Sequence, residues 1–337
     1  MTTPDPAPDW ATLDRLRERF LSGTAGHHDY WSSDAELAGY DATFAQRIGW
    51  KWAFVLDDLA RRGWIPPGGD VLDWGCGTGI AGRVFLERHG TDPQRVLWLH
   101  DRSPGALEYA STRARTRFPG LTVRTSSNPP GMAVALVSHV LTELTSGQVE
   151  ALVATLTRAD AILWIEPGTP PVARTLVAVR ERLTPMFHPV APCVHARPCG
   201  LLAPGRESDW CHHFATPPPG VFTDPFWARF GQRLGIDLRS VPLSYLVLDR
   251  RPPPPLPRGA WRLLGRPGWD KAHAHATRCD GDGVRQHTWS RREHPAAWRG
   301  VRKDRWESLQ DAGTNGGADV VGTETTGTGP PLTPPAA

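Results

Sequence analysis

The stretch Val71-Leu72-Asp73-Trp74-Gly75-Cys76-Gly77-Thr78-Gly79 decides the fold that the sequence predicts. Its apolar beginning is typical of a short buried strand, and helical sequence follows its last glycine. Glycines allow a sharp turn and let the backbone approach a ligand without a Cβ clash. The spacing Asp-x-Gly-x-Gly-x-Gly differs from the Gly-x-Gly-x-x-Gly pattern that binds pyrophosphate. The stretch therefore predicts a strand, a ligand-binding loop and a helix, in that order.

Strands and helices are predicted to alternate from this stretch onward. The expected strands are Val71–Trp74, Val96–His100, Leu121–Thr125, Ala133–His139 and Ala161–Glu166. The expected helices are Gly79–Arg88, Pro104–Arg117, Ser146–Thr157 and Val172–Leu183. Alternation with continuous apolar strands predicts an α/β fold with a doubly wound, Rossmann-like parallel sheet. Before it, Trp10–Trp64 is predicted to be mainly helical.

The glycine loop resembles motif I of class I S-adenosylmethionine-dependent methyltransferases. The resemblance implies that the loop packs against the amino-acid part of S-adenosylmethionine and that Asp73 helps to orient this cofactor. The loop glycines expected at this contact are Gly75, Gly77 and Gly79. Asp101 ends the second predicted strand, 22 residues after Gly79, where an acid suits hydrogen bonding to a ribose diol. The alternative is that Asp101 is an ordinary acid at the start of a helix.

The residues that follow the fourth predicted strand are expected at the carboxyl edge of the sheet, where ligands bind in such folds. They include His139 and Glu143. His139 is a candidate base, and Glu143 either holds a substrate group or caps and pairs locally. No indispensable catalytic residue is evident in the sequence.

Four of the five cysteines follow residue 190. Cys193, Cys199 and Cys211 have the spacing Cys-x5-Cys-x11-Cys, and Cys279 lies further along the chain. Thiolates bind soft or borderline metals, so zinc and an iron–sulfur cluster are both candidates. Neither the paired Cys-x2-Cys of zinc sites nor the tight Cys-x3-Cys-x2-Cys of radical methylating enzymes is present. Spacing alone leaves zinc, an iron–sulfur cluster and no metal open.

A second resemblance rests on five segments that occur in order. They are Ser138–Leu144, Ile165–Pro170, Ala191–Cys199, Asp209–Phe214 and Leu243–Arg250. Together they resemble the methyltransferase-like small-ribosomal-subunit assembly family known from mitochondria, with bacterial members (in words, the family of mitochondrial small-subunit protein twenty-two). The resemblance implies a 4Fe–4S cluster on Cys193, Cys199, Cys211 and Cys279. His212 departs from the family pattern and is an alternative imidazole ligand.

These observations predict a layout of seven regions. Residues 1–9 and 311–337 are expected to be disordered, 10–65 to form a helical region and 66–185 an S-adenosylmethionine-binding core. Residues 186–220 are expected to form a cysteine-cluster insertion, and 221–250 a helix and a strand that complete the sheet. Residues 251–310 are expected to form a small, basic, β-rich extension that carries the fourth cysteine.

Composition narrows the expected partners of this 337-residue chain. Its net charge is +3, but Arg250–Gln310 holds 14 Lys or Arg against 6 Asp or Glu, a local +8. Such a surplus suits phosphate contacts, and five tryptophans interleave with it. They are Trp261, Trp269, Trp289, Trp298 and Trp306. Each of them either stacks on bases or, as we favour, builds a small core. No apolar run is long enough to span a membrane and no signal peptide is recognised, so we expect a cytoplasmic protein without a membrane partner.

The sequence therefore predicts an S-adenosylmethionine-binding, iron–sulfur-containing, methyltransferase-like protein. It is expected to act on or assemble the small ribosomal subunit, with small-subunit ribosomal RNA or the subunit itself as partner. We favour a methyltransferase, although the sequence does not prove that the protein transfers a methyl group. The alternatives are a non-catalytic assembly factor and a small-molecule methyltransferase with a structural zinc site. The sequence does not indicate an oligomeric state.

Overall fold

The structure is a computed structural model that describes residues 9–21, 31–92, 94–311 and 318–319. Its main element is an eight-stranded sheet with the order β3-β2-β1-β4-β5-β8-β6, and β7 also pairs with β8. The strands are β1 (Val71–Trp74), β2 (Val96–His100), β3 (Thr122–Thr125), β4 (Val134–Ser138), β5 (Ala161–Pro167), β6 (His188–Ala191), β7 (His213–Ala215) and β8 (Val241–Asp249). β1 to β5 are parallel, and β8 runs antiparallel to both β5 and β6. This sheet confirms the predicted α/β class with parallel strands.

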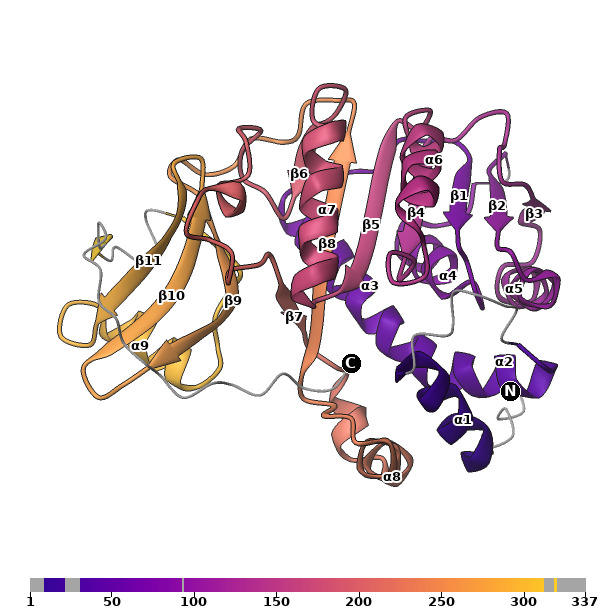
Figure 1. The fold of residues 1–337 in the computed structure, drawn as a ribbon, viewed down its shortest axis with the longest axis horizontal. Helices are drawn as coiled ribbons and strands as arrows, with labels where there is room; N and C mark the ends of the chain where they lie inside the picture. Colours follow the sequence, from indigo (N-terminus) through magenta and orange to yellow (C-terminus); the bar gives the residue numbers. More distant parts are fainter. Residues whose placement is uncertain (1–8, 22–30, 93, 312–317, 320–337) are drawn as a thin grey trace.

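Helices cover both faces of the large sheet (Figure 1). They are α3 (Phe44–Arg61), α4 (Ile80–His89), α5 (Pro104–Arg117), α6 (Ser146–Leu156) and α7 (Pro170–Leu183). The helices α1 (Trp10–Leu21), α2 (Asp34–Ala42) and α8 (Pro225–Leu234) lie beyond the ends of the strands (Figure 1), where α1 and α8 share a separate apolar cluster. Side chains of α3, α4 and α5 form one apolar core with one face of the strands, and those of α6 and α7 form a second core with the other face. Successive strand residues point to opposite faces, so Leu163 joins the first core and Trp164 the second.

Local sequence explains where these helices begin. The Ser103 side chain accepts a hydrogen bond from Ala106 N before α5, and Pro104 occupies the first turn. Thr145 and Gln148 form a capping box at the start of α6. The observed bounds of β1, β2 and α5 are the predicted ones.

A second, antiparallel sheet lies beyond the β6 end of the large one (Figure 1). Its order is β12-β9-β10-β11-β13. Its elements are β9 (Trp261–Trp269), β10 (His273–Asp280), β11 (Gly283–Ser290), β12 (Leu309–Gln310) and β13 (Ala318–Asp319), with helix α9 (Pro295–Arg302) packed on them. Trp261, Trp289 and Trp298 are buried in its core, as favoured from the sequence, whereas Trp269 is 52% exposed.

The structure differs from the predicted layout in two places. β13 falls within 311–337, where we expect disorder, and its backbone pairs with β11. β6 and β7 are absent from the expected strands, because each is short and is held by pairing with β8. Nearly all of the lead-in at 1–9 lies outside the described residues. Among the described helices, none is long and apolar enough to cross a membrane.

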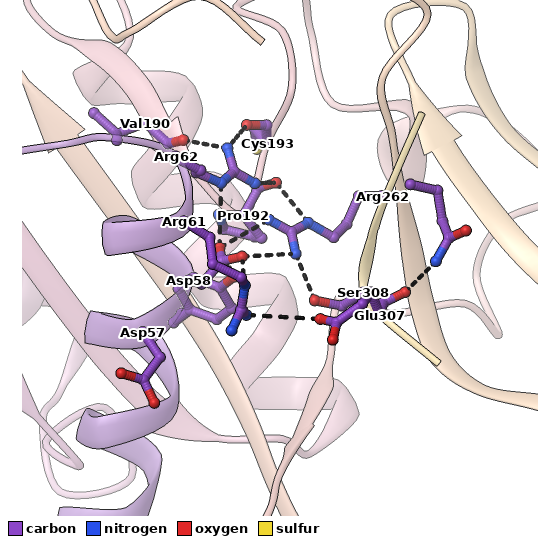
Figure 2. A network of polar contacts seen from close by, with 12 residues as sticks. Asp57, Asp58, Arg61, Arg62, Val190, Pro192, Cys193, Arg262, Glu307 and Ser308 are labelled. Carbon is purple, nitrogen blue, oxygen red and sulfur yellow. Dashed lines mark hydrogen bonds and ion pairs between the residues drawn. The ribbon is translucent and has the colours of Figure 1, made fainter. Parts of the chain in front are cut away.

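A buried ionic network joins the two sheets to α3 (Figure 2). Asp58 is fully buried on α3, and its Oδ2 lies 3.2 Å from Arg62 Nε and 2.9 Å from Arg262 Nη2 of β9. The Tyr245 hydroxyl on β8 donates to the same oxygen at 2.9 Å. One carboxylate thus balances two guanidinium groups that reach it from different parts of the chain.

The two arginines also hold the backbone that leads to Cys193. Arg62 donates to the carbonyls of Val190, Pro192 and Cys193, the last two at 2.8 and 3.0 Å. Arg262 donates to Pro192 O at 2.9 Å. Three of the four carbonyls from Val190 to Cys193 therefore have a charged donor, which fixes the path of the backbone.

We predict that Asp58→Asn destabilises the protein by about 3–5 kcal/mol, because two buried guanidinium groups lose their counter-charge. The free energy of unfolding measured in urea tests this. The neighbouring Asp57 is the matched control: it is directed away from the network in Figure 2 and pairs with Arg88 on the surface at 3.0 Å. Asp57→Asn is expected to cost about 1 kcal/mol or less. Equal losses in the two variants would contradict the prediction.

Candidate functional site

The glycine loop after β1 has a backbone that only glycine adopts without strain. Gly75 and Gly77 have φ values of +67° and +50°. A Cβ on Gly75 would lie 2.6 Å from Val140 Cγ1, whereas a Cβ on Gly77 would meet nothing within 4 Å. Gly75 is therefore required for packing against the β4 side. Gly77 borders open space, where a ligand can approach its backbone.

Asp73, near the end of β1, supports this loop through a hydrogen bond to the helix that follows the loop. It is fully buried, and its Oδ2 accepts a hydrogen bond from Gly82 N of α4 at 2.8 Å. Its Oδ1 has no partner among the described residues. Burial raises the pKa of Asp73 to about 7. Asp73 is thus placed to orient the loop rather than to line the space in front of it.

Asp101 follows β2 and closes the loop from the other side. Its Oδ2 accepts from Gly77 N at 2.8 Å and its Oδ1 from Ser103 N at 2.9 Å. The N-cap of α5 is Ser103, so Asp101 is not simply a capping acid. Both strand ends meet at the carboxyl edge of the sheet, because Trp74 pairs with His100 in the β1–β2 register.

A cleft of about 1290 Å³ opens at this edge. One side is formed by the loop residues Gly75–Thr78 and by Asp101, and another by the segment Pro167–Pro170 after β5. Trp210 and Arg266 line the part nearest the second sheet. The cleft therefore lies where ligands bind in folds of this kind.

Three titratable groups lie at or just behind this cleft: Lys51 and Glu166 are buried, and His139 is partly buried. The Lys51 Nζ atom is 3.2 Å from His139 Nε2. Burial lowers the pKa of Lys51 to about 7 and lowers that of His139 well below its usual range. Glu166 is fully buried, and its Oε1 accepts from Val140 N at 3.0 Å and from Trp164 Nε1 at 2.7 Å.

Of these three groups, the sequence pointed only to His139. Lys51 is one of three lysines and falls on the apolar stripe of α3, between Ile48 and Trp52. Glu166 ends an otherwise apolar strand at the carboxyl edge. A lysine on an apolar helix face and a glutamate at the end of an apolar strand can both be recognised in the sequence, but their nearness to His139 follows only from the order of the strands.

Glu143 lies at the rim of the cleft and not at its floor. Its Oε2 is 3.4 Å from Arg102 Nη2, and its side chain is 26% exposed. Glu143 lines the cleft and pairs with a neighbouring cation, and its contact with a substrate group stays a prediction.

The four late cysteines line one small cavity, although they come from distant segments. Cys193 follows β6, Cys199 precedes the 3-10 turn Gly200–Leu202, Cys211 precedes β7 and Cys279 lies on β10. Burial raises the pKa of Cys199 to about 11 and raises those of Cys211 and Cys279 further. The fifth cysteine, Cys76, is buried at the glycine loop, away from this cavity.

A buried arginine provides positive charge to the cysteine cavity. Arg180 of α7 donates to Cys193 Sγ at 3.2 Å and to the carbonyls of His195 and Arg197 at 3.1 and 3.0 Å. It is 2% exposed. The cavity thus contains a fixed cation that stabilises thiolate charge.

The spacing of the sulfurs bears on which group fits them. Four thiolates around one zinc ion lie about 3.8 Å apart, as tetrahedral Zn–S bonds of about 2.3 Å require. Across the described part of the chain, no three of the four Sγ atoms lie within 4.8 Å of one another. The cavity supplies four thiol ligands, the number that either a tetrahedral zinc site or a 4Fe–4S cluster takes.

The position of His212 differs from that of a metal ligand at this cavity. Its ring stacks on Trp210 with centroids 4.3 Å apart, and it lines the large cleft. Residues of the segment Trp210–Phe214 alternate in direction. Trp210, His212 and Phe214 face the cleft, while Cys211 faces the cysteine cavity. The two sites are thus opposite sides of one extended segment.

A parallel sheet with an inserted antiparallel strand, a glycine loop after its first strand and an acid after its second are the features of class I S-adenosylmethionine-dependent methyltransferases. The family described as mitochondrial small ribosomal subunit Rsm22 matches residues 70–309. The chain belongs to this family. The match includes the glycine loop and all four late cysteines.

Comparison with solved structures finds methyltransferases at low sequence identity and low TM-score. A putative RNA methyltransferase from Pyrococcus horikoshii is 12% identical, with 59% of this chain and 82% of that chain covered and a TM-score of 0.37. Magnesium protoporphyrin IX methyltransferase from Synechocystis, solved with bound S-adenosylmethionine, is 12% identical, with 73% and 100% covered and a TM-score of 0.37. No curated protein matches the sequence.

We predict a pH dependence of stability that arises from Glu166. Burial raises the pKa of Glu166 from 4.5 to about 7, so within this window the folded state holds a proton that the unfolded chain releases. Stability therefore falls as pH rises through the window. Glu166→Gln is expected to reduce this fall by on the order of 2 kcal/mol between about pH 5 and about pH 8.

Urea unfolding of the wild type and the variant at the two pH values measures this difference. The control is Glu150→Gln, which removes an exposed carboxylate that pairs with Arg182 on the surface. It is expected to leave the fall unchanged. A Glu166→Gln protein with the pH dependence of the wild type would show that Glu166 is ionised throughout.

Proposed function

We propose that this protein binds S-adenosylmethionine at the glycine loop, carries a 4Fe–4S cluster on four cysteines and acts on or assembles the small ribosomal subunit. The observation that carries the proposal is the segment Trp210–Phe214, which supplies a cysteine to one site and three aromatic side chains to the other. Each site is thereby built on the same segment as the other.

The residues around the cleft suit S-adenosylmethionine. The cofactor supplies a methyl group on a sulfonium centre, and the chain supplies the backbone of Gly77, the carboxylate of Asp101 and a neighbouring hydroxyl. That hydroxyl, Thr78 Oγ1, is buried at the wall of the cleft and has no hydrogen-bond partner among the described residues. Asp73 and Gly79 complete the support of the loop.

The residues around the cysteine cavity suit a cluster with a structural role. Cys193, Cys199 and Cys211 belong to the insertion at 186–220, and Cys279 belongs to the extension at 251–310. A cluster that joins all four would fasten the second sheet to the methyltransferase core. The Arg180 guanidinium donates to Cys193 Sγ and offsets the negative charge of the thiolates.

The basic extension supports a partner rich in phosphate. Part of its positive charge is used internally, since Arg262 pairs with Asp58, and Arg278 and Arg285 pair with Asp280. The remaining cations concentrate on α9 and its flanks. The exposed cations on α9 and its flanks are Arg291, Arg292, Arg299, Arg302, Lys303 and Arg305. They suit contacts with RNA phosphates, as small-subunit ribosomal RNA would provide.

The cleft also contains residues that could take part in methyl transfer. Methyl transfer needs an acceptor aligned with the sulfonium methyl and a group that takes up the released proton. His139, with Lys51 against it, is the candidate for that proton, and Glu143 at the rim is the candidate to hold the acceptor. The alternative is a non-catalytic assembly factor that uses the same two sites only for stability. A cytoplasmic location stays a prediction, because the family is described as mitochondrial.

We predict that the wild type transfers labelled methyl groups from S-adenosylmethionine to small-subunit ribosomal RNA, and that Gly77→Ala does not. The added methyl group at Gly77 enters the cleft and costs about 1–2 kcal/mol of backbone strain, which a folded domain tolerates. Cofactor affinity by calorimetry and subunit binding by sedimentation accompany the assay.

Three outcomes are distinct. Transfer by the wild type alone supports the enzyme. Subunit binding that weakens steeply with salt but shows no transfer supports the assembly factor. Failure of the wild type to bind S-adenosylmethionine would overturn the cofactor assignment.

We predict that protein purified without oxygen contains about four irons and four sulfides per chain, and that Cys199→Ser loses most of them. Cys76→Ser is the matched control, because Cys76 lies at the glycine loop, and it is expected to keep its iron. Limited proteolysis should cut residues 251–310 faster in Cys199→Ser than in the control. One stoichiometric zinc in place of iron would contradict the assignment.

A further inference from the structure

Two histidines and an aspartate meet at the turn between β9 and β10. Trp269 ends β9, Asp270 lies in the turn and β10 begins at His273. His273 and His275 point to the same face of β10, because they flank Ala274, which is fully buried on the other face. The turn therefore projects both imidazoles toward the carboxylate of Asp270.

The Asp270 carboxylate is fixed by the turn itself. Its Oδ1 accepts hydrogen bonds from Ala272 N and His273 N, each at 2.7 Å. The Asp270 carbonyl accepts from Trp298 Nε1 of α9 at 2.9 Å. The position of the carboxylate consequently requires no cation, and its Oδ2 is left to face His275.

The ligand atoms of these three side chains are close enough for one ion. Asp270 Oδ2 lies 3.1 Å from His275 Nε2, and Asp270 Oδ1 lies 3.8 Å from His273 Nδ1. One potential ligand atom from each residue lies within 4.8 Å of those of the other two. Imidazole and carboxylate ligands together suit zinc, nickel and copper, and not magnesium or calcium.

The surroundings of His275 match those of a metal-bound histidine. Its Nδ1 atom is 3.3 Å from the hydroxyl of Thr288, the residue directly opposite on β11. Ligating histidines in proteins usually have their second nitrogen held in this way by an oxygen, which fixes the ring and its tautomer. The contact with Thr288 involves Nδ1, so the other ring nitrogen of His275, Nε2, is left to face Asp270 Oδ2.

We infer that Asp270, His273 and His275 form a binding site for a divalent transition-metal ion of the zinc type, separate from the cysteine cavity. Water completes the coordination, because both imidazoles are 46% exposed. Lys271 lies in the same turn, and Arg291 donates to its carbonyl, so nearby positive charge weakens the site. The ion joins the turn at Asp270 to the start of β10 and so stiffens the tip of the second sheet.

The test uses Co²⁺ as the probe, titrated into cluster-loaded protein without oxygen. Cobalt bound by imidazole and carboxylate shows only weak visible bands, whereas cobalt bound by cysteine adds intense charge transfer in the near ultraviolet. We expect one equivalent bound without charge transfer, and a loss of affinity of at least tenfold in both His275→Gln and Asp270→Asn. Asn keeps an acceptor oxygen for the turn, so Asp270→Asn preserves the hairpin.

The matched control is His188→Gln, which removes an exposed histidine at the start of β6 and is expected to leave the Co²⁺ affinity unchanged. Circular dichroism of each variant checks that the fold is retained. Equal Co²⁺ affinity in the wild type and in His275→Gln would overturn the inference. So would binding that appears only with the charge-transfer band of a thiolate ligand.

Discussion

The buried carboxylate of Asp58 is the contact on which the arrangement of the two sheets depends. It pairs with Arg62 of its own helical end and with Arg262 of β9, and it accepts the hydroxyl of Tyr245 on β8. Burial makes each of these charges costly unless all are present, because an unpaired charge in the interior has no water to stabilise it. The network therefore determines how the second sheet sits on the core, in a way that apolar packing alone does not.

The same network extends to the cysteine cavity. Arg62 and Arg262 converge on the carbonyl of Pro192, one residue before Cys193. Arg180 approaches Cys193 from α7 and holds the carbonyls beyond it. Three guanidinium groups thus position Cys193. They also donate hydrogen bonds to nearby backbone carbonyls, whose burial without partners would be unfavourable.

The sequence predicts those parts of the fold that depend on neighbouring residues. The bounds of β1, β2 and α5 follow from apolar runs, glycines and a serine cap that act within a few positions. The four cysteines also line one cavity, as the family resemblance implies, although three of them lie between β6 and β7 of the large sheet and the fourth lies on a strand of the second sheet. Contacts that join distant segments are not predictable in this way: Tyr245 and Arg262 lie 187 and 204 residues from Asp58. Lys51 and Glu166 are missed for the same reason, because their depth depends on the packing around them.

The place of β8 in the sheet imposes an order on folding. In the described sheet path β6 is paired only with β8, a strand that follows it by about fifty residues. The strands β1 to β5, which form the half with the glycine loop, can pair as soon as residue 167 is made, whereas β6 has no neighbour until residues 241–249 leave the ribosome. Cys193, Cys199 and Cys211 are all synthesised before that strand. During synthesis the strands β1 to β5 can therefore pair before β8 and Cys279 have been made. Until then Cys193, Cys199 and Cys211 lack the strand and the fourth cysteine that enclose them in the finished protein.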